Sequence, residues 1–399
     1  MQTENTGKYD YQAIWQRLLN WIEENEYKSF DVSDTLSTKL YLTLLWFYKR
    51  YRIGKYVYFP FYKLNQLFPK QIRSIAGVSK QEFPQAYAII VKALLNIFRK
   101  SNDTWHLDKA INLSDKLFKI KNTDFQYNCW GQPFDWYTRK LIPKYTPRTT
   151  VTSQVASAFL DMYEVTKQEK YLLEAKSAAK FFIHEMNYFT DKEGDICFPY
   201  TAIDDYKVHN ANTLAAAVLY RVYNHTGEDI FKDFSIRSFQ FTVKHQTPEG
   251  AWYYWAPPDK LLYRIDNYHT GFVLESLLEA KECMQTNFRF ETALKDGLNY
   301  YIENLFAENR IPKMTNKKTY PIDIQSCAQS LITFSKADKF YPSNSNRIKK
   351  ITEWTMNNMF DHEKNYFYYR KYKSGRTDKT PYIRWSESWM LHALSFLIK

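Results

Sequence analysis

Five polar segments recur along the chain at almost constant spacing, and each is followed by a stripe of small or apolar residues with helical periodicity. If Ser153, Asn212, His269, Gln325 and Glu387 are taken as equivalent, consecutive members lie 59, 57, 56 and 62 residues apart. A period of this length, with a second amphipathic helix between consecutive polar starts, is typical of stacked helical pairs. One such pair cannot bury both of its apolar faces, so neighbouring pairs must pack against one another.

The repeat unit consists of an aromatic extended segment, an inner helix that begins at the polar residues, and an outer helix. Outer helices are predicted over residues 171–186, 230–245, 290–305 and 347–359. The aromatic segments precede the inner helices at residues 130–137, 198–200, 252–255 and 366–369. Amphipathic spacing also predicts helices over residues 9–27, 36–51, 84–98 and 105–120. Residues 52–81 are rich in rings and broken by proline, which predicts an irregular connection packed on the body.

Pairing of the last predicted helix, 382–398, with the first would bring the two ends together and complete six pairs. We therefore predict an all-α fold, an (α/α)6 toroid or barrel of helical hairpins with short aromatic β-like segments between pairs, in preference to an open superhelix. No linker rich in Gly, Ser or Pro divides the chain. Residues 1–399 are thus predicted to form a single domain, with regular repeats over 121–399 and a less regular pattern over 1–120.

Several classes of protein are excluded by the sequence. No apolar run reaches the roughly 20 residues that a membrane-spanning helix needs. The polar N-terminus lacks the pattern of a signal peptide, so a cytoplasmic location is expected. The four cysteines are far apart, which argues against a disulfide framework or a cysteine zinc site. There is no G-x-G-x-x-G, P-loop, H-E-x-x-H or G-x-S-x-G motif, so no nucleotide or metal cofactor is predicted.

The formal net charge of +12 favours an acidic partner. The basic residues are spread along the chain without a nucleic-acid-binding signature, so an acidic sugar or glycan is predicted and nucleic acid is not. A positive charge that serves only solubility would also explain this composition. Aromatic residues make up 18% of the chain, more than a core requires. Such a surplus is consistent with rings that stack on sugars, although rings that fill gaps between helices would also explain it.

Titratable and hydrogen-bonding residues cluster at the predicted starts of the inner helices, where free backbone N–H groups favour anions. In a closed ring these starts would meet at one cavity. The candidate catalytic residues are His269, Tyr268, Asp266, Glu387 and Asp323. The candidate substrate-binding residues are Asn210, Asn212, Asn267, Gln325, Arg384, Trp252, Trp255 and Trp385. Helix capping alone would explain the Ser, Asn and Asp members, but it does not explain Tyr268, His269, Arg384 or Glu387.

Three kinds of activity fit this inventory. Tyr268 or His269 could remove the proton next to a uronic carboxylate that Asn or Arg side chains neutralise, as in a lyase or a C5-epimerase. Two carboxyl groups could instead hydrolyse a glycosidic bond, and Asp204, Asp205, Asp266, Asp323 and Glu387 supply candidates. The same residues could also bind a glycan without chemistry.

A family resemblance accompanies these residues. The strings Ile265-Asp-Asn-Tyr-His-Thr-Gly-Phe-Val-Leu-Glu-Ser276 and Pro381-Tyr-Ile-Arg-Trp-Ser-Glu-Ser-Trp-Met390, together with 354–359 and 366–370, resemble bacterial VpsJ-like proteins of surface-polysaccharide gene clusters. The resemblance covers roughly residues 127–399. It implies an (α/α) toroid that makes or modifies a capsule or exopolysaccharide, with site candidates at Asp266, Asn267, His269, Arg384 and Trp385. More distantly, the pattern resembles the helical toroid of D-glucuronyl C5-epimerases and of uronyl-glycan hydrolases and lyases, whose N-terminal β-rich region has no counterpart here.

The favoured prediction is a cofactor-independent, carbohydrate-active enzyme, an epimerase, lyase or glycoside hydrolase. In it, His269 and Tyr268 are acid/base groups, Asp266 orients them or acts as a base, Arg384 holds a carboxylate or phosphate, and Trp252, Trp255 and Trp385 stack on sugar rings. The alternative is a non-catalytic module that binds a glycan or a protein of the polysaccharide assembly machinery. A helical scaffold that holds peptide or nucleic acid in an open groove is a third possibility.

Overall fold

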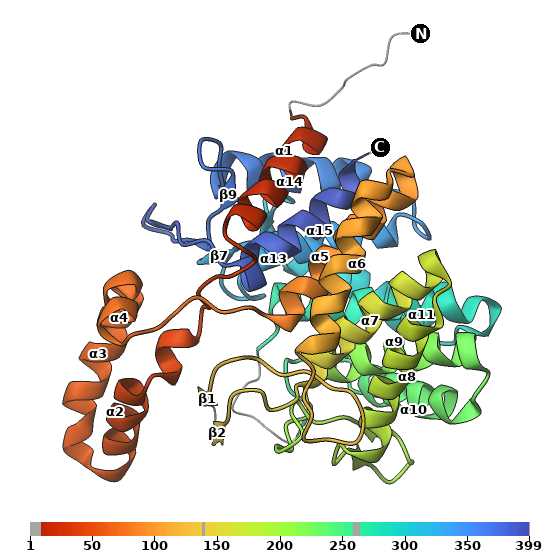
Figure 1. Ribbon diagram of the computed structural model, residues 1–399, viewed down its shortest axis with the longest axis horizontal. Coiled ribbons are helices and arrows are strands. Elements are labelled where there is room, and N and C mark those ends of the chain that lie inside the picture. Colours follow the sequence, from red (N-terminus) through yellow and green to blue (C-terminus); the bar gives the residue numbers. More distant parts are fainter. Residues whose placement is uncertain (1–8, 138–139, 258–263, 399) are drawn as a thin grey trace.

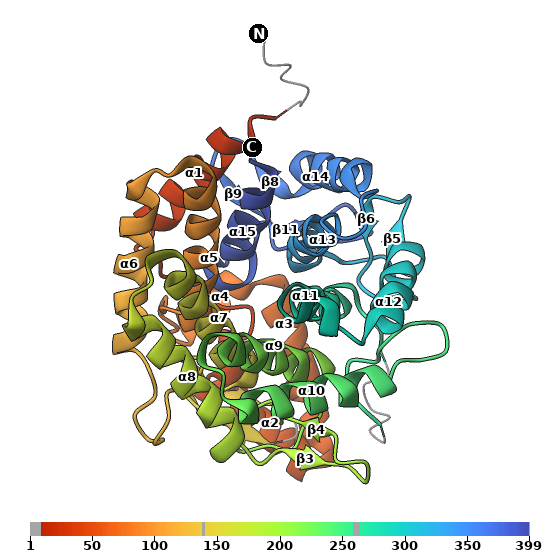
Figure 2. The same cartoon turned by 90° about the vertical axis from the view of Figure 1, so that its right-hand side faces the viewer.

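The computed structural model describes residues 9–137, 140–257 and 264–398. Residues 1–8, on which part of the signal-peptide expectation rests, lie outside these ranges. Figure 2 shows two concentric rings of helices. The inner helices are α5 (Pro84–Ser101), α7 (Thr149–Thr166), α9 (His209–Thr226), α11 (Asn267–Met284), α13 (Ile324–Ala337) and α15 (Ser388–Leu397). The outer helices are α1 (Tyr11–Glu24), α6 (Thr104–Lys119), α8 (Glu169–His184), α10 (Asp229–Lys244), α12 (Glu291–Asn304) and α14 (Ser345–Met359).

The ring is closed, because each inner helix packs against the next one and α15 packs against α5. The first outer helix, α1, completes the last pair by packing on α15. Trp15 of α1 stabilises this contact with α15, because its indole Nε1 donates a hydrogen bond of 3.0 Å to the carbonyl oxygen of Leu391. The predicted (α/α)6 toroid is thus confirmed, including the pairing of the two ends of the chain.

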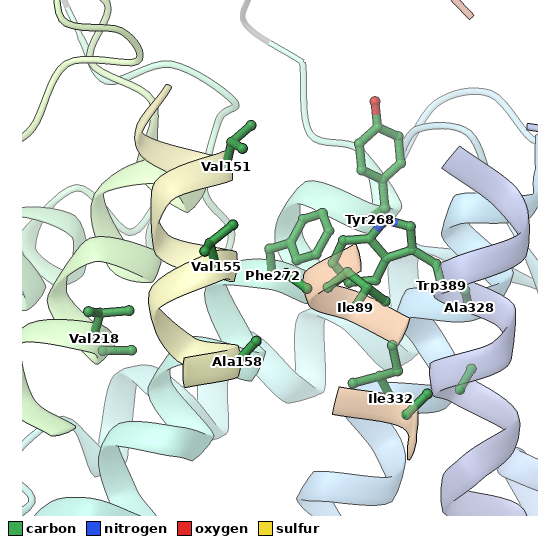
Figure 3. Packing of buried hydrophobic residues seen from close by; sticks show 14 of the residues in the cluster. Ile89, Val151, Val155, Ala158, Val218, Tyr268, Phe272, Ala328, Ile332 and Trp389 are labelled. Carbon is green, nitrogen blue, oxygen red and sulfur yellow. The ribbon is translucent and has the colours of Figure 1, made fainter. Parts of the chain in front are cut away.

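The inner helices are buried on almost every side, as expected for helices that form the centre of a large domain. In α7 every residue from Thr149 to Met162 is buried. Figure 3 shows how side chains from separate inner helices, among them Ile89, Val155, Phe272 and Trp389, pack together. This apolar packing holds the inner-helix N-termini in fixed positions.

Short antiparallel hairpins join the outer helices to the next inner helices, as the predicted β-like segments between pairs require. Four of them are β1 (Trp136–Tyr137) with β2 (Leu141–Ile142), β3 (Phe189–Thr190) with β4 (Ile196–Cys197), β5 (Phe306–Ala307) with β6 (Ile311–Pro312), and β8 (Phe360–Asp361) with β9 (Tyr366–Phe367). A three-stranded sheet has the order β11 (Thr377–Asp378), β10 (Arg370–Lys371), β7 (Ile322–Asp323). Its register sets Arg370 opposite both Asp323 and Asp378.

Residues 39–75 form a helical insertion between α1 and α5, with the helices α2 (Lys39–Arg50), α3 (Lys55–Leu67) and α4 (Pro69–Ile75). Figure 1 shows it standing apart from the ring. The prediction of an irregular segment over 52–81 was therefore wrong. Pro60 lies inside α3 and cannot donate a backbone hydrogen bond. Aromatic packing between α2 and α3 compensates for the stability that this loss costs. The ring of Tyr58 stacks on Tyr48 at a centroid distance of 4.9 Å, and its hydroxyl lies 2.7 Å from that of Tyr41.

Within the described ranges, no helix combines the length and the apolar character that crossing a bilayer requires.

Gly297 of α12 permits close packing between an outer helix and the core. A Cβ at this position would lie 2.7 and 2.8 Å from two ring carbons of Trp252 and 2.9 Å from Cδ2 of Leu274. Gly→Ala in a helix normally stabilises by about 0.5–1 kcal/mol, but these distances are too short for ordinary contact. We expect Gly297→Ala to lower the free energy of unfolding by about 1–2 kcal/mol, measured by urea denaturation. Lys295→Ala, at an exposed position of the same helix, should change it by less than about 0.5 kcal/mol.

Candidate active site

A cavity of about 570 Å³ opens at the N-terminal ends of the inner helices. This size is within the range of small-molecule sites. Leu214, Phe272 and Trp389 contribute apolar lining, and the insertion and the segment before it close one side with Thr35, Asn65 and Arg73. Figure 3 shows the ring of Tyr268, another lining residue, with its hydroxyl pointing away from the apolar cluster. The cavity is thus a polar space above an apolar floor.

His269 is held in one orientation by Asp266. Asp266 is the N-cap of α11 and accepts a hydrogen bond of 3.0 Å from the backbone N–H of His269. Both oxygens of the same carboxylate lie 2.8 Å from Nδ1 of His269. The side chain of Asp266 therefore both caps α11 and orients the imidazole of His269. With the Nδ1 proton directed to Asp266, Nε2 of His269 is left to accept a proton, and it has no hydrogen bond to any described residue.

Two tyrosine rings enclose the imidazole. The ring centroid of Tyr268 lies 4.1 Å from that of His269, and the centroid of Tyr254 lies 4.2 Å from it. Trp385 packs against Tyr268 with its ring edge, at 5.7 Å. Tyr254, Tyr268, His269 and Trp385 all line the cavity. These rings restrict the orientation of the imidazole, whose side chain stays 16% exposed.

Burial sets the protonation state of these groups. Burial lowers the pKa of His269 below its ordinary value, and the nearby Asp266 carboxylate opposes this only in part. Burial also raises the pKa of Tyr268 well above that of a free phenol. At neutral pH His269 is therefore a neutral imidazole that can accept a proton, and Tyr268 is a phenol that can donate one.

Four of the five arginines that line the cavity are paired with carboxylates. Arg73 contacts Asp34 at 3.0 Å, Arg264 contacts Asp266 at 3.1 Å, Arg370 contacts Asp323 at 2.7 Å, and Arg384 forms an ion pair with Asp31. All of these pairs except that of Arg264 with Asp266 join segments far apart in the sequence, including the chain before the insertion. They hold the guanidinium groups in place and largely offset their charge.

The fifth arginine, Arg148, has no carboxylate within 4.0 Å among the described residues. Its guanidinium lies over the rings of Phe134 and Trp136, at 5.3 and 4.9 Å. Burial lowers the pKa of Arg148 to about 10, so the group remains charged at neutral pH. Its Nε is buried and has no hydrogen-bond partner in the described part of the chain. A buried, unpaired cation that lines a cavity is a site for the negative charge of a ligand.

Five amide side chains also line the cavity with unused hydrogen-bonding atoms. The side-chain oxygens of Asn65, Gln132, Gln154, Asn210 and Gln325 are buried and have no hydrogen-bond partner among the described residues, and the same holds for the amide nitrogen of Gln325. Because buried polar atoms are normally paired, these atoms are available to the hydroxyl groups of a ligand.

Thirteen site residues were predicted from the sequence. Six of them line the cavity in the structure, and a seventh, Asp266, lies directly behind the lining. The lining residues are Asn210, Tyr268, His269, Gln325, Arg384 and Trp385. Asp323 is fully buried and accepts hydrogen bonds from Arg370 and Trp385, at 2.7 and 2.9 Å. It therefore positions two lining residues and does not face the cavity itself.

Five predicted residues make structural contacts outside this lining. The amide of Asn212 bonds to Phe198 N and Ser238 O, and that of Asn267 bonds to Leu305 O and Tyr301. Glu387 accepts a hydrogen bond of 2.9 Å from Phe367 N, and burial raises its pKa well above the ordinary value, so it is a neutral acid. Trp252 donates to Thr242 O, and Trp255 stacks on Tyr206.

The two further acids considered for hydrolysis, Asp204 and Asp205, do not line the cavity either. Asp204 closes a turn by accepting hydrogen bonds from Thr201 and from the backbone of Tyr200 and Tyr206.

Sequence reasoning missed Arg148, Gln154, Tyr200 and Tyr254 as lining residues. A signal for Arg148 was present, because it is the N-cap residue of α7 and thus matches Asp266 and Asp323, the N-cap residues of α11 and α13. In the parts of the chain that the structure describes, no group of three or more His, Cys, Asp or Glu side chains is arranged to hold a metal ion.

The chain matches no protein-family model. No curated protein sequence matches it either. Solved structures with the same fold include the GH76 α-mannanase BT2949 of Bacteroides thetaiotaomicron, with a TM-score of 0.66 and 12% identity over 98% of this chain and 96% of that one. Cellobiose 2-epimerase from Bacillus thermoamylovorans B4167 has a TM-score of 0.63 and 11% identity over 79% and 87% of the two chains. A family 88 glycosyl hydrolase from Bacteroides vulgatus has a TM-score of 0.60 and 11% identity over 79% and 93%. At these identities the likeness establishes the (α/α)6 toroid fold.

Proposed function

We propose that this protein is a carbohydrate-active enzyme that moves a proton to and from a carbon atom of an acidic sugar, as an epimerase or a lyase. The observation that carries the proposal is the neutral imidazole of His269, oriented by Asp266, at a cavity that also holds the unpaired guanidinium of Arg148. The names of the structural neighbours, which include an epimerase and two glycoside hydrolases, support a carbohydrate substrate.

The proposed reaction begins at the carbon that bears the sugar carboxylate. Arg148, with Arg384 beside it, neutralises the carboxylate, which makes the adjacent C–H more acidic. Nε2 of His269 accepts that proton, and the electron pair of the C–H bond passes into the carboxylate as an enediolate. Return of a proton from Tyr268 to the opposite face gives the epimer. In the elimination, the electron pair of the enediolate instead forms a C=C bond while the bond to the neighbouring glycosidic oxygen breaks, and Tyr268 protonates that departing oxygen. The amides of Gln154, Asn210 and Gln325 hold the sugar hydroxyl groups.

Glycoside hydrolysis is the second candidate, favoured by the likeness to the GH76 mannanase over 98% of this chain. It needs two carboxyl groups that face each other across the bond. Asp378 is the one carboxylate among the described residues that line the cavity, so a nearby acid such as Asp266 would have to move. We therefore place hydrolysis second. The resemblance to VpsJ-like proteins supports a bacterial cell-surface glycan as the substrate and its assembly proteins as partners.

The decisive experiment incubates the purified protein with uronic-acid oligosaccharides and neutral oligosaccharides in heavy water. Deuterium at C5 without cleavage indicates epimerisation, and a new double bond indicates elimination. Cleavage with neither of these indicates hydrolysis and would overturn the proton-transfer mechanism. If no substrate reacts while acidic sugars still bind, the protein is a non-catalytic module.

Arg148→Gln tests the acidic nature of the substrate. We expect it to raise KM for a uronic-acid substrate about 10- to 100-fold, because a charge-assisted hydrogen bond is lost, and to leave the binding of neutral sugars almost unchanged. Because Arg148 has no carboxylate partner, the substitution leaves no buried acid unpaired and the fold should persist. Arg289→Gln, at an exposed position, is the matched control. Equal loss of acidic and neutral substrates would contradict the assignment.

A further inference from the structure

The helical insertion carries most of the large apolar side chains that the described chain exposes. Eleven of the eighteen exposed large apolar residues fall within Leu40–Ile75, although this segment is less than a tenth of the sequence. Trp46 is 60% exposed, Tyr56 69% and Ile53 66%. The insertion projects from the ring in Figure 1, and it contacts the rest of the described chain through Arg73, which donates to the hydroxyl of Tyr382, and Lys49, which donates to that of Tyr137. Exposed apolar surface of this kind marks a contact with a partner or a membrane.

The charge of the same segment is of one sign. No Asp or Glu occurs from Thr35 to Gln81, whereas nine Lys and Arg residues do. All of these basic residues except Arg73, which pairs with Asp34, are exposed. A surface that is both apolar and basic is complementary to one that offers hydrocarbon and negative charge together.

The two properties coincide at the junction of α2 and α3, residues 49–57, which we call the basic-aromatic tip. Within these nine residues four basic side chains alternate with four apolar ones, and all eight are exposed: Lys49, Arg50, Tyr51, Arg52, Ile53, Lys55, Tyr56 and Val57. Only Gly54 is buried, packed against the backbone of Phe47 and Tyr48. This close approach fixes the turn and directs its neighbours outward.

We propose that the insertion binds the surface of a bilayer that contains anionic lipids, with the basic-aromatic tip at the level of the headgroups. Tyr51, Ile53, Tyr56 and Val57 would enter the interface while the four basic residues contact lipid phosphates. Amphipathic rings are well suited to this boundary, because one end is apolar and the other is polar. Attachment of this kind needs no spanning helix, and it does not depend on the reaction proposed above.

The charge pattern favours a bilayer over a second copy of this chain. In a symmetric dimer the same patch meets itself, so the basic residues of the two tips would face each other with no acidic residue in the segment to pair with them. The negative headgroups of an anionic bilayer can pair with all of these basic residues at once.

Co-sedimentation with vesicles tests the proposal on the full chain. We expect binding to vesicles of phosphatidylcholine mixed with phosphatidylglycerol, weaker binding at high salt, and little binding to phosphatidylcholine alone. Arg50→Glu with Arg52→Glu should weaken partitioning at least about tenfold, given the contribution of each basic residue near the surface. Ile53→Ser with Tyr56→Ser should weaken it by a similar factor. Circular dichroism and Tm would confirm that the variants fold.

Matched substitutions elsewhere on the surface provide the controls. Lys349→Glu with Lys350→Glu removes an exposed basic pair on α14, and Leu173→Ser with Ile230→Ser removes two exposed apolar side chains on α8 and α10. These should leave vesicle binding unchanged. The proposal is overturned if the wild type does not bind anionic vesicles, if the control variants lose as much binding as the tip variants, or if light scattering shows that the tip mediates self-association instead.

Discussion

Replacement of His269 by Gln is expected to lower the turnover number of the proposed reaction by about 10²–10⁴-fold, the usual contribution of a positioned acid/base group. Gln keeps hydrogen-bonding capacity but cannot accept and release a proton. The backbone N–H of residue 269 would still bond to Asp266, so the start of α11 should be preserved. Because the loss concerns the chemical step, kcat should fall while KM changes little. Deuterium uptake into the sugar provides the assay.

The pH dependence separates this role from a structural one. Since burial lowers the pKa of His269, the base is deprotonated and active from a pH below 6.5 upward, and activity should be lost as pH falls through that pKa. The carboxylate of Asp266 raises the pKa of His269, so Asp266→Asn should move this limb to still lower pH. His184→Gln, at an exposed position on α8, should change neither rate nor profile. An unchanged kcat in His269→Gln, or a limb that does not move in Asp266→Asn, contradicts the assignment.

The arrangement of the ring could be predicted from the sequence because it is repetitive. Apolar spacing located both helices of each pair to within a few residues, and the constant period indicated that they stack. The insertion could not be predicted in the same way. It occurs once, its helices are stabilised by contacts such as Tyr48 with Tyr58, and a proline within α3 suggested a break in the chain.

The site was predicted less completely than the fold, for two physical reasons. Each residue turns a helix by about 100°, so an alignment error of one or two positions changes the face. Asn210 lines the cavity while Asn212, two residues later, bonds to Ser238 behind it. The second reason is that contacts between distant segments leave no local pattern. Arg384 pairs with Asp31 across 353 residues, and nothing near either residue indicates the other.

The C-terminal halves of the inner helices, away from the cavity, hold a buried network of charges centred on Arg221 of α9. Its guanidinium donates hydrogen bonds of 2.7 Å to both Asp161 and Glu164 and one of 3.1 Å to Glu279. These acids belong to α7 and α11, so one side chain links three neighbouring inner helices. Nothing in this network faces the cavity, and its role is to hold the ring together.

Arg221→Met is expected to lower the free energy of unfolding by about 3–5 kcal/mol at neutral pH, because it leaves buried carboxylates without their partner. Met keeps the unbranched apolar stem of the Arg side chain and removes the guanidinium, so the loss reflects mainly the missing charge. Urea denaturation followed by circular dichroism measures it. Arg237→Met removes an exposed ion pair with Asp233 and should cost less than about 1 kcal/mol. A similar small effect at Arg221 would mean that the network does not stabilise the ring.

Lowering the pH should reduce the difference in free energy of unfolding between Arg221→Met and the wild type. Burial alone would raise the pKa of Asp161, but the charges of Arg221, Arg99 and Lys92 together more than offset it, so that pKa lies well below its usual range. The pKa of Glu279 is also lowered, since Lys336 and Arg221 together outweigh burial. Carboxyl groups with lowered pKa stabilise the fold above their unfolded pKa of about 4 and lose this effect as pH falls. In Arg221→Met these acids have a higher pKa, so as the pH falls they become neutral at a higher pH than in the wild type. The stability of the wild type should therefore fall more steeply between about pH 6 and pH 3 than that of the variant, and parallel curves would show that Arg221 does not set these pKa values.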